Sequence, residues 1–311
     1  MKKIASIDIG SNTVRLLILE CDENQNFRIL ASRRVITRLG EGMDIHGKLM
    51  APRMSATLSA LSAFRQDCLD NGNPPLHAVA TSAVREASNG EEFVRLAQKE
   101  TGIEIEIIPW EEEAHLTLEG VFWKIPHENR KILTFDIGGG STEFILSEGK
   151  NIAGFCSSSL GVVRLTEKFI HQHPVDNTEY ENLATHLKNE LQTIKEKLSA
   201  FMPQVLIGTA GTVTTLAALK DNIYPYDPEK IHGTLLPRQD IENLIQDLKR
   251  KSLNERLALK SLEPGREDLI IAGTALVLET MRTFQCDPLL VSEYSLREGI
   301  ILKALKTPEV L

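Results

Sequence analysis

The sequence predicts an α/β protein built from two similar halves. Three observations lead to this prediction: the length, the alternation of strand and helix patterns, and a turn that occurs twice. At 311 residues the chain suits about two domains of roughly 150 residues. Asp8-Ile9-Gly10 and Asp136-Ile137-Gly138 lie 136 − 8 = 128 residues apart, and each stands between two apolar strands. This pattern indicates a degenerate repeat of a whole domain.

The first half begins with apolar runs at 4–9 and 14–19 on either side of a polar, glycine-containing turn. Such a pattern predicts a strand, a tight turn and a returning strand. The other elements expected in this half are a strand over 28–36, a helix over 50–69, a strand over 77–80, a helix over 88–99 opened by a Ser88/Glu91 capping box, a strand over 103–107 and a helix over 112–123.

The second half repeats the strand, turn and strand pattern over 132–146, after a polar, proline-containing junction at 124–131. Its other expected elements are helices over 179–201, 238–251, 268–284 and 296–305 and strands over 205–207 and 289–291.

Composition narrows the class of protein. The chain has 35 Lys and Arg against 43 Asp and Glu, a net charge of −8, which argues against a broad grip on nucleic acid or on an anionic membrane. No apolar run reaches the roughly 20 residues that span a bilayer, and no signal peptide is recognisable. We therefore expect a cytoplasmic protein. The four cysteines have neither metal-ligand nor redox-motif spacing.

Two turns are candidates for phosphate binding. Gly10-Ser11-Asn12-Thr13 presents consecutive backbone N–H groups and small polar side chains, although an ordinary hairpin turn would look similar. Gly138-Gly139-Gly140-Ser141-Thr142 is more specific, because three successive glycines cost backbone entropy and suit close approach to a ligand. With Asp136 before it and Glu143 after it, this loop can hold both phosphate and Mg²⁺.

Three further segments allow a functional and a structural interpretation. Gly208-Thr209-Ala210-Gly211-Thr212 is a phosphate loop or a plain strand-to-helix turn. Thr81-Ser82-Ala83-Val84-Arg85 caps a helix whose N-terminus favours anions, with Arg85 as a phosphate ligand or a surface residue. Glu111-Glu112-Glu113 is a solvated first helical turn or the source of a general base.

The two Asp-Ile-Gly loops resemble the phosphate loops of the actin-like ATPase superfamily. Within it, the chain resembles the exopolyphosphatase / guanosine pentaphosphate phosphohydrolase (Ppx/GppA) family from residue 4 to about 303. The segments that carry this resemblance are Arg38-Leu39-Gly40-Glu41-Gly42, Thr81-Ser82-Ala83-Val84-Arg85-Glu86-Ala87, Glu112-Glu113-Ala114, Leu160-Gly161-Val162-Val163-Arg164-Leu165-Thr166 and Ser295-Leu296-Arg297-Glu298-Gly299.

The resemblance implies two RNase H-like domains, over 1–124 and 125–295. Each would be a mixed five-stranded sheet flanked by helices, with the active site in the cleft between the domains. A C-terminal helix over 296–311 is expected to pack back on the first domain. The chain lacks the C-terminal helical extension of longer family members, so the short, two-domain form is expected.

The resemblance also implies residue roles. Glu113 matches the catalytic base, and Asp136 and Glu143 match carboxylates that hold Mg²⁺ and position water, with Asp8 as a further candidate ligand. Trp110-Glu111 stands where the family often has Ser-Gly. The residues expected to bind phosphate are Gly10, Ser11, Asn12, Thr13, Arg85, Gly138, Gly139, Gly140, Ser141, Thr142, Gly208, Gly211 and Thr212.

The activity implied is Mg²⁺-dependent hydrolysis of a terminal phosphoanhydride. Inorganic polyphosphate is the favoured substrate, with guanosine pentaphosphate as the alternative, and activation by monovalent ions is left open. Family members are often dimers, so the resemblance allows a homodimer, but the sequence itself leaves the oligomeric state open. An ATP-dependent small-molecule kinase of the same superfamily is the more distant alternative, and a nucleotide-switched chaperone or filament protein is a third.

Overall fold

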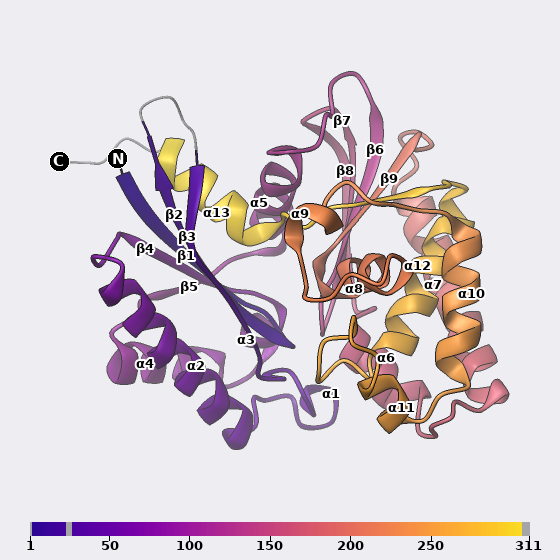
Figure 1. Ribbon diagram of the computed structural model, residues 1–311, viewed down its shortest axis with the longest axis horizontal. Coiled ribbons are helices and arrows are strands. Elements are labelled where there is room, and N and C mark those ends of the chain that lie inside the picture. Colours follow the sequence, from indigo (N-terminus) through magenta and orange to yellow (C-terminus); the bar gives the residue numbers. More distant parts are fainter. Residues whose placement is uncertain (1, 23–26, 307–311) are drawn as a thin grey trace. The chain divides into compact units, whose positions relative to one another are not determined.

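The computed structural model describes residues 2–22 and 27–306. The chain divides into two compact units, which are described separately (Figure 1). The first contains the residues up to Gly120 together with the segment from Leu296 onward, and the second is Val121–Ser295. Among the described helices, none combines the length and the apolar composition that a bilayer crossing requires.

The first unit is built on a five-stranded mixed sheet in the order β3-β2-β1-β4-β5. β1 pairs antiparallel with β2 and parallel with β4. Its strands are β1 (Lys2–Ile9), β2 (Thr13–Cys21), β3 (Phe27–Ile36), β4 (Leu76–Ala80) and β5 (Ile105–Ile107). Its helices are α1 (Met43–His46), α2 (Ala51–Asp70), α3 (Ser82–Glu86), α4 (Gly90–Thr101), α5 (Trp110–Phe122, which ends in the second unit) and α13 (Leu296–Lys306).

Side-chain alternation along β1 gives the first sheet two different faces. Ala5, Ile7 and Ile9 pack into one core with residues of α2 and α4. Figure 1 shows these two helices beside the first sheet. Ser6 points to the opposite face, where its hydroxyl donates a hydrogen bond of 2.9 Å to the carbonyl oxygen of Arg297 in α13. Asp8 follows the same alternation, so it lies on the α13 face of the sheet.

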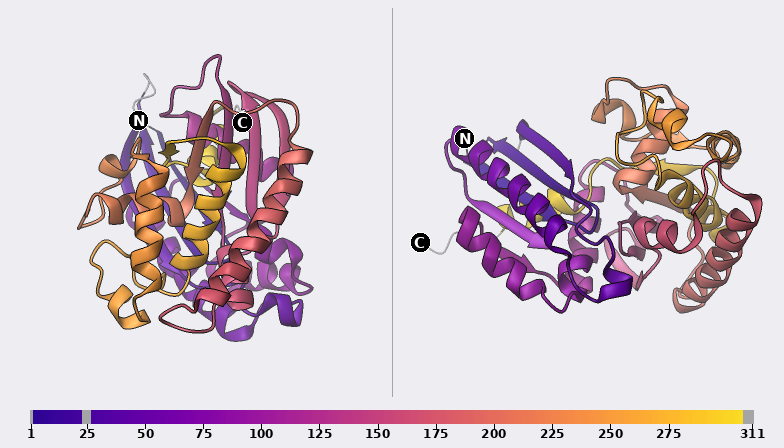
Figure 2. Two further views of the ribbon diagram at one scale, coloured as in Figure 1. Left: turned by 90° about the vertical axis from the view of Figure 1, so that its right-hand side faces the viewer. Right: turned by 90° about the horizontal axis from the view of Figure 1, so that it is seen from below.

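The second unit has a six-stranded sheet in the order β10-β11-β9-β6-β7-β8. Figure 2 shows α12 between α7 and α10 along one face of this sheet. The strands are β6 (Lys131–Ile137), β7 (Thr142–Glu148), β8 (Asn151–Ser158), β9 (Val205–Thr209), β10 (Leu235–Leu236) and β11 (Leu289–Val291). The helices are α6 (Val162–Phe169), α7 (Asn177–Lys197), α8 (Ala210–Lys220), α9 (Pro228–Ile231), α10 (Arg238–Lys249), α11 (Leu253–Leu257) and α12 (Ile270–Phe284).

The two units repeat one topology, which confirms the internal repeat predicted from the sequence. In each, an antiparallel hairpin is followed by parallel strands on the other side of its first strand. A shift of register in the outer ladder of each hairpin also recurs at the equivalent position. The ladder of β2 and β3 shifts register after Ile18, ten residues past Asp8 (18 − 8), and that of β7 and β8 shifts after Leu146, ten residues past Asp136 (146 − 136).

Several predicted boundaries differ from the observed ones. The N-terminal part of the first unit ends at Gly120, whereas the predicted domain boundary lies after Lys124. The second sheet carries a sixth strand, β10, whose two residues are too few to leave an alternating pattern. α13 covers Leu296–Lys306 of the predicted 296–311 helix, and residues 307–311 lie outside the described residues.

The predicted capping box at the start of α4 is wrong. The N-cap is Asn89, not Ser88, and it makes no side-chain capping hydrogen bond. Its amide instead bonds the backbone of Leu49, accepting at 2.8 Å and donating at 3.1 Å. This tertiary contact holds Asn89 in place before the first helical residue, Gly90, where an added Cβ would lie 2.0 Å from the Val84 carbonyl oxygen.

The substitution Gly299→Ala tests how closely α13 packs in the first unit. A Cβ at this position would lie 1.8 Å from the Leu116 carbonyl oxygen in α5, so backbone must move. We expect urea denaturation to show a free energy of unfolding lower by about 1–3 kcal/mol. Lys306→Ala is the control, since it removes only an exposed ion pair with Glu119 and should cost at most about 1 kcal/mol. Equal stability of Gly299→Ala and wild type would contradict this packing.

Candidate active site

The first glycine loop closes the hairpin between β1 and β2. The N–H of Gly10 donates to the carbonyl oxygen of Thr13 at 3.0 Å, which makes a tight turn through Ser11 and Asn12. The segment before α1 supports this turn from one side. The N–H of Gly40 donates to the Ser11 carbonyl oxygen at 2.7 Å, and those of Thr37 and Arg38 both donate to the Asn12 carbonyl oxygen at 3.0 Å.

The second glycine loop has the same closure and a different support. The N–H of Gly138 donates to the carbonyl oxygen of Ser141 at 2.9 Å. The first two N–H groups of α6, those of Val162 and Val163, donate to the carbonyl oxygens of Gly138 and Gly139 at 3.0 and 2.9 Å. The hydroxyl of Thr142 also donates to the Leu160 carbonyl oxygen at 2.8 Å.

These supports determine where the loop N–H groups point. In a planar trans peptide, the N–H of the next residue points opposite to the carbonyl. Because the supporting segments bind the carbonyl oxygens, the N–H groups of Asn12, Thr13, Gly139 and Gly140 point away from those segments. Each loop thus directs two successive N–H groups to one side, the arrangement by which backbone binds anions.

A pair of carboxylates stands beside the second loop. Asp136, one residue before the end of β6, lies directly opposite Glu143 in the antiparallel ladder of β6 and β7, so both side chains lie on one face of the sheet. Phe144, on the other face, packs in the core of the unit. Glu143 is only 2% exposed, and its Oε1 accepts hydrogen bonds from the hydroxyls of Ser141 at 2.7 Å and Ser157 at 3.1 Å.

Glu113 is a buried carboxylate in the first turn of α5. Glu113 is 7% exposed, and its Oε2 lies 2.8 Å from Nη1 of Arg85. The same nitrogen also donates to the Ile108 carbonyl oxygen at 2.9 Å. The Arg85 guanidinium carbon lies 5.4 Å from the ring centre of Trp110. Nε and Nη2 of Arg85 are buried and have no hydrogen-bond partner among residues 2–22 and 27–306. Arg85 therefore holds Glu113 in one position. The partner that the structure gives to Arg85, predicted as a phosphate ligand, is thus the Glu113 carboxylate.

The identity of the chain follows from its comparison with known proteins. Residues 17–308 match the Ppx/GppA phosphatase family. The chain belongs to this family. Exopolyphosphatase 2 of Mycobacterium tuberculosis is 30% identical over 315 residues, which cover 97% of this chain and 98% of that protein. A bifunctional 3-dehydroquinate synthase/phosphatase of Fusobacterium nucleatum is 34% identical over 312 residues, but the chain spans only 46% of its length.

Solved structures agree with this assignment. The Ppx/GppA family member of Aquifex aeolicus is 33% identical, has a TM-score of 0.83, and the match covers 98% of this chain and 97% of that one. An exopolyphosphatase from Cytophaga hutchinsonii has a TM-score of 0.91 at 29% identity, with 98% of both chains covered. The chain is thus a phosphoanhydride hydrolase of the Ppx/GppA family with the actin-like ATPase fold.

The carboxylate pair of this Ppx/GppA protein fits the donor set of Mg²⁺. Magnesium usually takes one or two carboxylates and completes its shell with water and phosphate oxygens. Asp136 and Glu143 supply two carboxylates beside a loop whose N–H groups suit phosphate. No group of three or more His, Cys, Asp and Glu that could hold a metal ion occurs in the described part of the chain. A bound Mg²⁺ would therefore depend on water and substrate for most of its shell.

Asp8 occupies the position in the first unit that Asp136 has in the second. Its partner in the ladder of β1 and β2 is Arg15, so a cation and not a second carboxylate lies opposite it. Asn12 nearby is 4% exposed, and its Oδ1 has no hydrogen-bond partner among the described residues. The first loop thus has a polar, N–H-rich surface but no second carboxylate across the hairpin.

The third glycine segment is the end of β9 and the first turn of α8. Gly208 lies inside β9, where a Cβ would meet Phe135 at 2.9 Å, so core packing accounts for this glycine. Gly211 and Thr212 lie in α8, whose N-cap Thr209 makes no capping hydrogen bond. A Cβ on Gly211 would lie 2.1 Å from Nη2 of Arg266, whose guanidinium therefore covers this helix start.

Two residues that contact the glycine segments were not predicted from the sequence as site residues, namely Gly161 and Arg266. Gly161 appeared only within a family motif, yet a Cβ there would lie 2.2 Å from the Gly139 carbonyl oxygen. A glycine directly before an apolar helix was the available signal. Arg266 carried no signal, because its contact with Gly211 joins segments far apart in the chain.

Three of the cysteines have thiols of low reactivity. Burial raises the pKa of the Cys68, Cys156 and Cys286 thiols. They are therefore protonated at neutral pH and poor nucleophiles.

The substitution Gly161→Ala should disturb the second glycine loop without unfolding the protein. The added methyl group displaces the Gly139 peptide, and a misplacement of about 1 Å can cost about 10²-fold in rate. We expect a loss of phosphatase kcat/KM of about that size, with an unchanged circular dichroism spectrum. The control is Gly154→Ala on β8, where the tightest contact of the Cβ is with the end of the Leu198 side chain at 3.1 Å and its other neighbours lie at ordinary distances. An active Gly161→Ala enzyme would show that α6 does not support the loop.

Proposed function

We propose that this protein is a Mg²⁺-dependent exopolyphosphatase, which hydrolyses the terminal phosphoanhydride of inorganic polyphosphate and releases orthophosphate. The observation that carries the proposal is Glu113, a buried carboxylate held by Arg85 at 2.8 Å. A hydrolase needs such a group to take a proton from water, whereas a kinase directs the phosphoryl group to an acceptor hydroxyl.

Phosphate binding, proton transfer and metal binding fall to different residues in this proposal. In the second unit, the N–H groups of Gly139 and Gly140 bind phosphate oxygens and reduce their negative charge. In the first unit, those of Asn12 and Thr13 offer the same kind of contact to an anion. Glu113 accepts a proton from water while the water oxygen bonds to the terminal phosphorus. The bond from that phosphorus to the bridging oxygen breaks, so orthophosphate and a chain shorter by one phosphate are formed. A bound Mg²⁺ would stabilise charge on the phosphate oxygens next to Asp136 and Glu143.

Two relatives support polyphosphate as the substrate. The proteins of Mycobacterium tuberculosis and Cytophaga hutchinsonii that match nearly their whole length are both named exopolyphosphatases. Guanosine pentaphosphate remains the competing substrate, because the family name includes both activities and both molecules end in a phosphoanhydride.

The substitution Glu113→Gln should keep the fold and lower kcat by roughly 10²–10⁴-fold, since the amide cannot accept the proton of water. The measurement is phosphate release from polyphosphate under saturating substrate. The matched control is Glu112→Gln, one residue earlier on α5, whose side chain pairs at the surface with Lys303. Turnover of Glu113→Gln close to that of Glu112→Gln would refute the assignment of the base.

The preferred substrate can be identified by measuring kcat/KM for inorganic polyphosphate and for guanosine pentaphosphate with the same enzyme preparation. We expect kcat/KM for phosphate release from inorganic polyphosphate to exceed that for guanosine pentaphosphate. We also expect both activities to disappear with EDTA and to return with added Mg²⁺. A higher kcat/KM for guanosine pentaphosphate would reverse the substrate assignment and leave the hydrolytic mechanism intact.

A further inference from the structure

The segment between β11 and α13 crosses the carboxyl ends of the parallel strands in the second unit. The N–H of Ser292 donates to the Gly208 carbonyl oxygen at the end of β9 at 2.8 Å. The hydroxyl of Thr209 donates to the Tyr294 carbonyl oxygen at 3.3 Å. The hydroxyl of Ser295 then donates to Oδ2 of Asp136 at the end of β6. The segment thus passes from β11 over β9 to the carboxylate expected to hold Mg²⁺.

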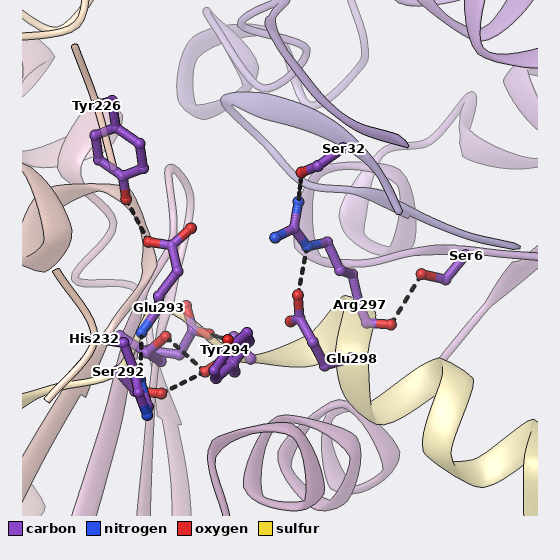
Figure 3. Close-up of polar contacts among 12 residues, drawn as sticks. Ser6, Ser32, Tyr226, His232, Ser292, Glu293, Tyr294, Arg297 and Glu298 are labelled. Atoms are coloured by element: carbon purple, nitrogen blue, oxygen red, sulfur yellow. Dashed lines mark hydrogen bonds and ion pairs between the residues drawn. The ribbon is translucent and has the colours of Figure 1, made fainter. Parts of the chain in front are cut away.

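This crossing segment is held by its own contacts within the second unit (Figure 3). The Ser292 hydroxyl donates to the Tyr294 carbonyl oxygen at 2.7 Å, and the Tyr226 hydroxyl donates to the Glu293 carboxylate. The N–H of Glu293 donates to Nδ1 of His232 at 3.4 Å, and the ring centres of His232 and Tyr294 lie 4.7 Å apart. The backbone that carries Ser295 is therefore fixed from several directions.

The residues after Ser295 are anchored as well. Leu296 begins α13, and Nε of Arg297 lies 2.7 Å from the Glu298 carboxylate in a buried ion pair. The hydroxyl of Ser6 in β1 donates to the carbonyl oxygen of Arg297 (Figure 3). Ser295 itself belongs to the second unit and is 4% exposed, so the contacts of the crossing segment within that unit already limit the freedom of its hydroxyl to leave Asp136.

An aspartate needs such a partner if it is to bind Mg²⁺ well. The carboxyl torsion of an isolated aspartate is broad, so its oxygens sample many directions. Magnesium requires nearly ideal octahedral geometry, and a hydrogen bond to one carboxylate oxygen selects the orientation in which the ligand is presented.

We propose that Ser295 is a positioning residue for the metal site, and that its hydroxyl orients the Asp136 carboxylate toward Mg²⁺. The assignment rests on the proposed function, because it takes Asp136 to be a ligand of the Mg²⁺ used in hydrolysis. Ser295 acts through Asp136 and touches neither the metal nor the phosphate.

The test compares Ser295→Ala, Ser295→Thr and Ser292→Ala with wild type. Binding of Mn²⁺, used as a spectroscopic probe for Mg²⁺, is followed by electron paramagnetic resonance without substrate, and Mg²⁺ activation is followed by phosphate release from polyphosphate. We expect Ser295→Ala to weaken Mn²⁺ binding and to raise the half-activating Mg²⁺ concentration by roughly 10–100-fold. Ser295→Thr keeps the hydroxyl and should recover most of the loss.

Ser292→Ala is the matched control, because it removes a buried hydroxyl from the same segment without removing a contact to a carboxylate. It should leave Mn²⁺ affinity within about twofold of wild type, because its hydroxyl bonds the Tyr294 carbonyl oxygen and not a carboxylate expected to hold the metal. Unchanged Mn²⁺ affinity in Ser295→Ala, or an equal loss in Ser292→Ala, would overturn the assignment. If Ser295→Ala does not fold, Ser295→Cys, with a weaker donor, takes its place and should also weaken Mn²⁺ binding. A wild-type enzyme that binds Mn²⁺ but releases no phosphate from polyphosphate would refute the proposed function alone.

Discussion

Both glycine loops depend on the same constraint, namely that their carbonyl oxygens must be bound before their N–H groups can serve an anion. A free loop presents both groups, and its carbonyl dipoles would repel phosphate. In the first loop the N–H groups of Thr37, Arg38 and Gly40 bind the carbonyl oxygens, and in the second the N-terminus of α6 does so. The N-terminus of α6 is thereby occupied, and the anion-binding surface lies on the opposite side of the loop.

The repeat explains how one topology came to hold two different loops. Asp8 and Asp136 occupy equivalent ends of β1 and β6, and in each hairpin the opposing residue lies seven positions later (15 − 8 and 143 − 136). That residue is Arg15 in the first unit and Glu143 in the second. The change of charge at one ladder position makes a carboxylate pair in the second unit and a mixed pair in the first. The difference between the loops is therefore electrostatic, because their backbone closure is the same.

The sequence could predict what depends on neighbouring residues. The repeat, both glycine loops and most strands follow from local apolar patterns and turn residues, and the cross-hairpin position of Glu143 follows from the length of the turn. Contacts between distant segments could not be predicted this way. Ser295 and Asp136 are 159 positions apart, and the contact of Arg85 with Glu113 bridges 28. The Ser88 capping box failed because a tertiary contact, Asn89 with Leu49, outweighed a local preference.

The choice of serine at position 295 also follows from electrostatics. An arginine or lysine could orient Asp136 equally well, but its charge would neutralise the carboxylate and compete with a divalent cation for it. In the first unit a charged residue, Arg15, lies opposite Asp8 in the ladder, where the second unit has Glu143 opposite Asp136. A hydroxyl donates one hydrogen bond and carries no charge, so Asp136 is held in place with its negative charge intact. The hydroxyls of Ser141 and Ser157 act on Glu143 in the same way, so three neutral donors orient the two carboxylates.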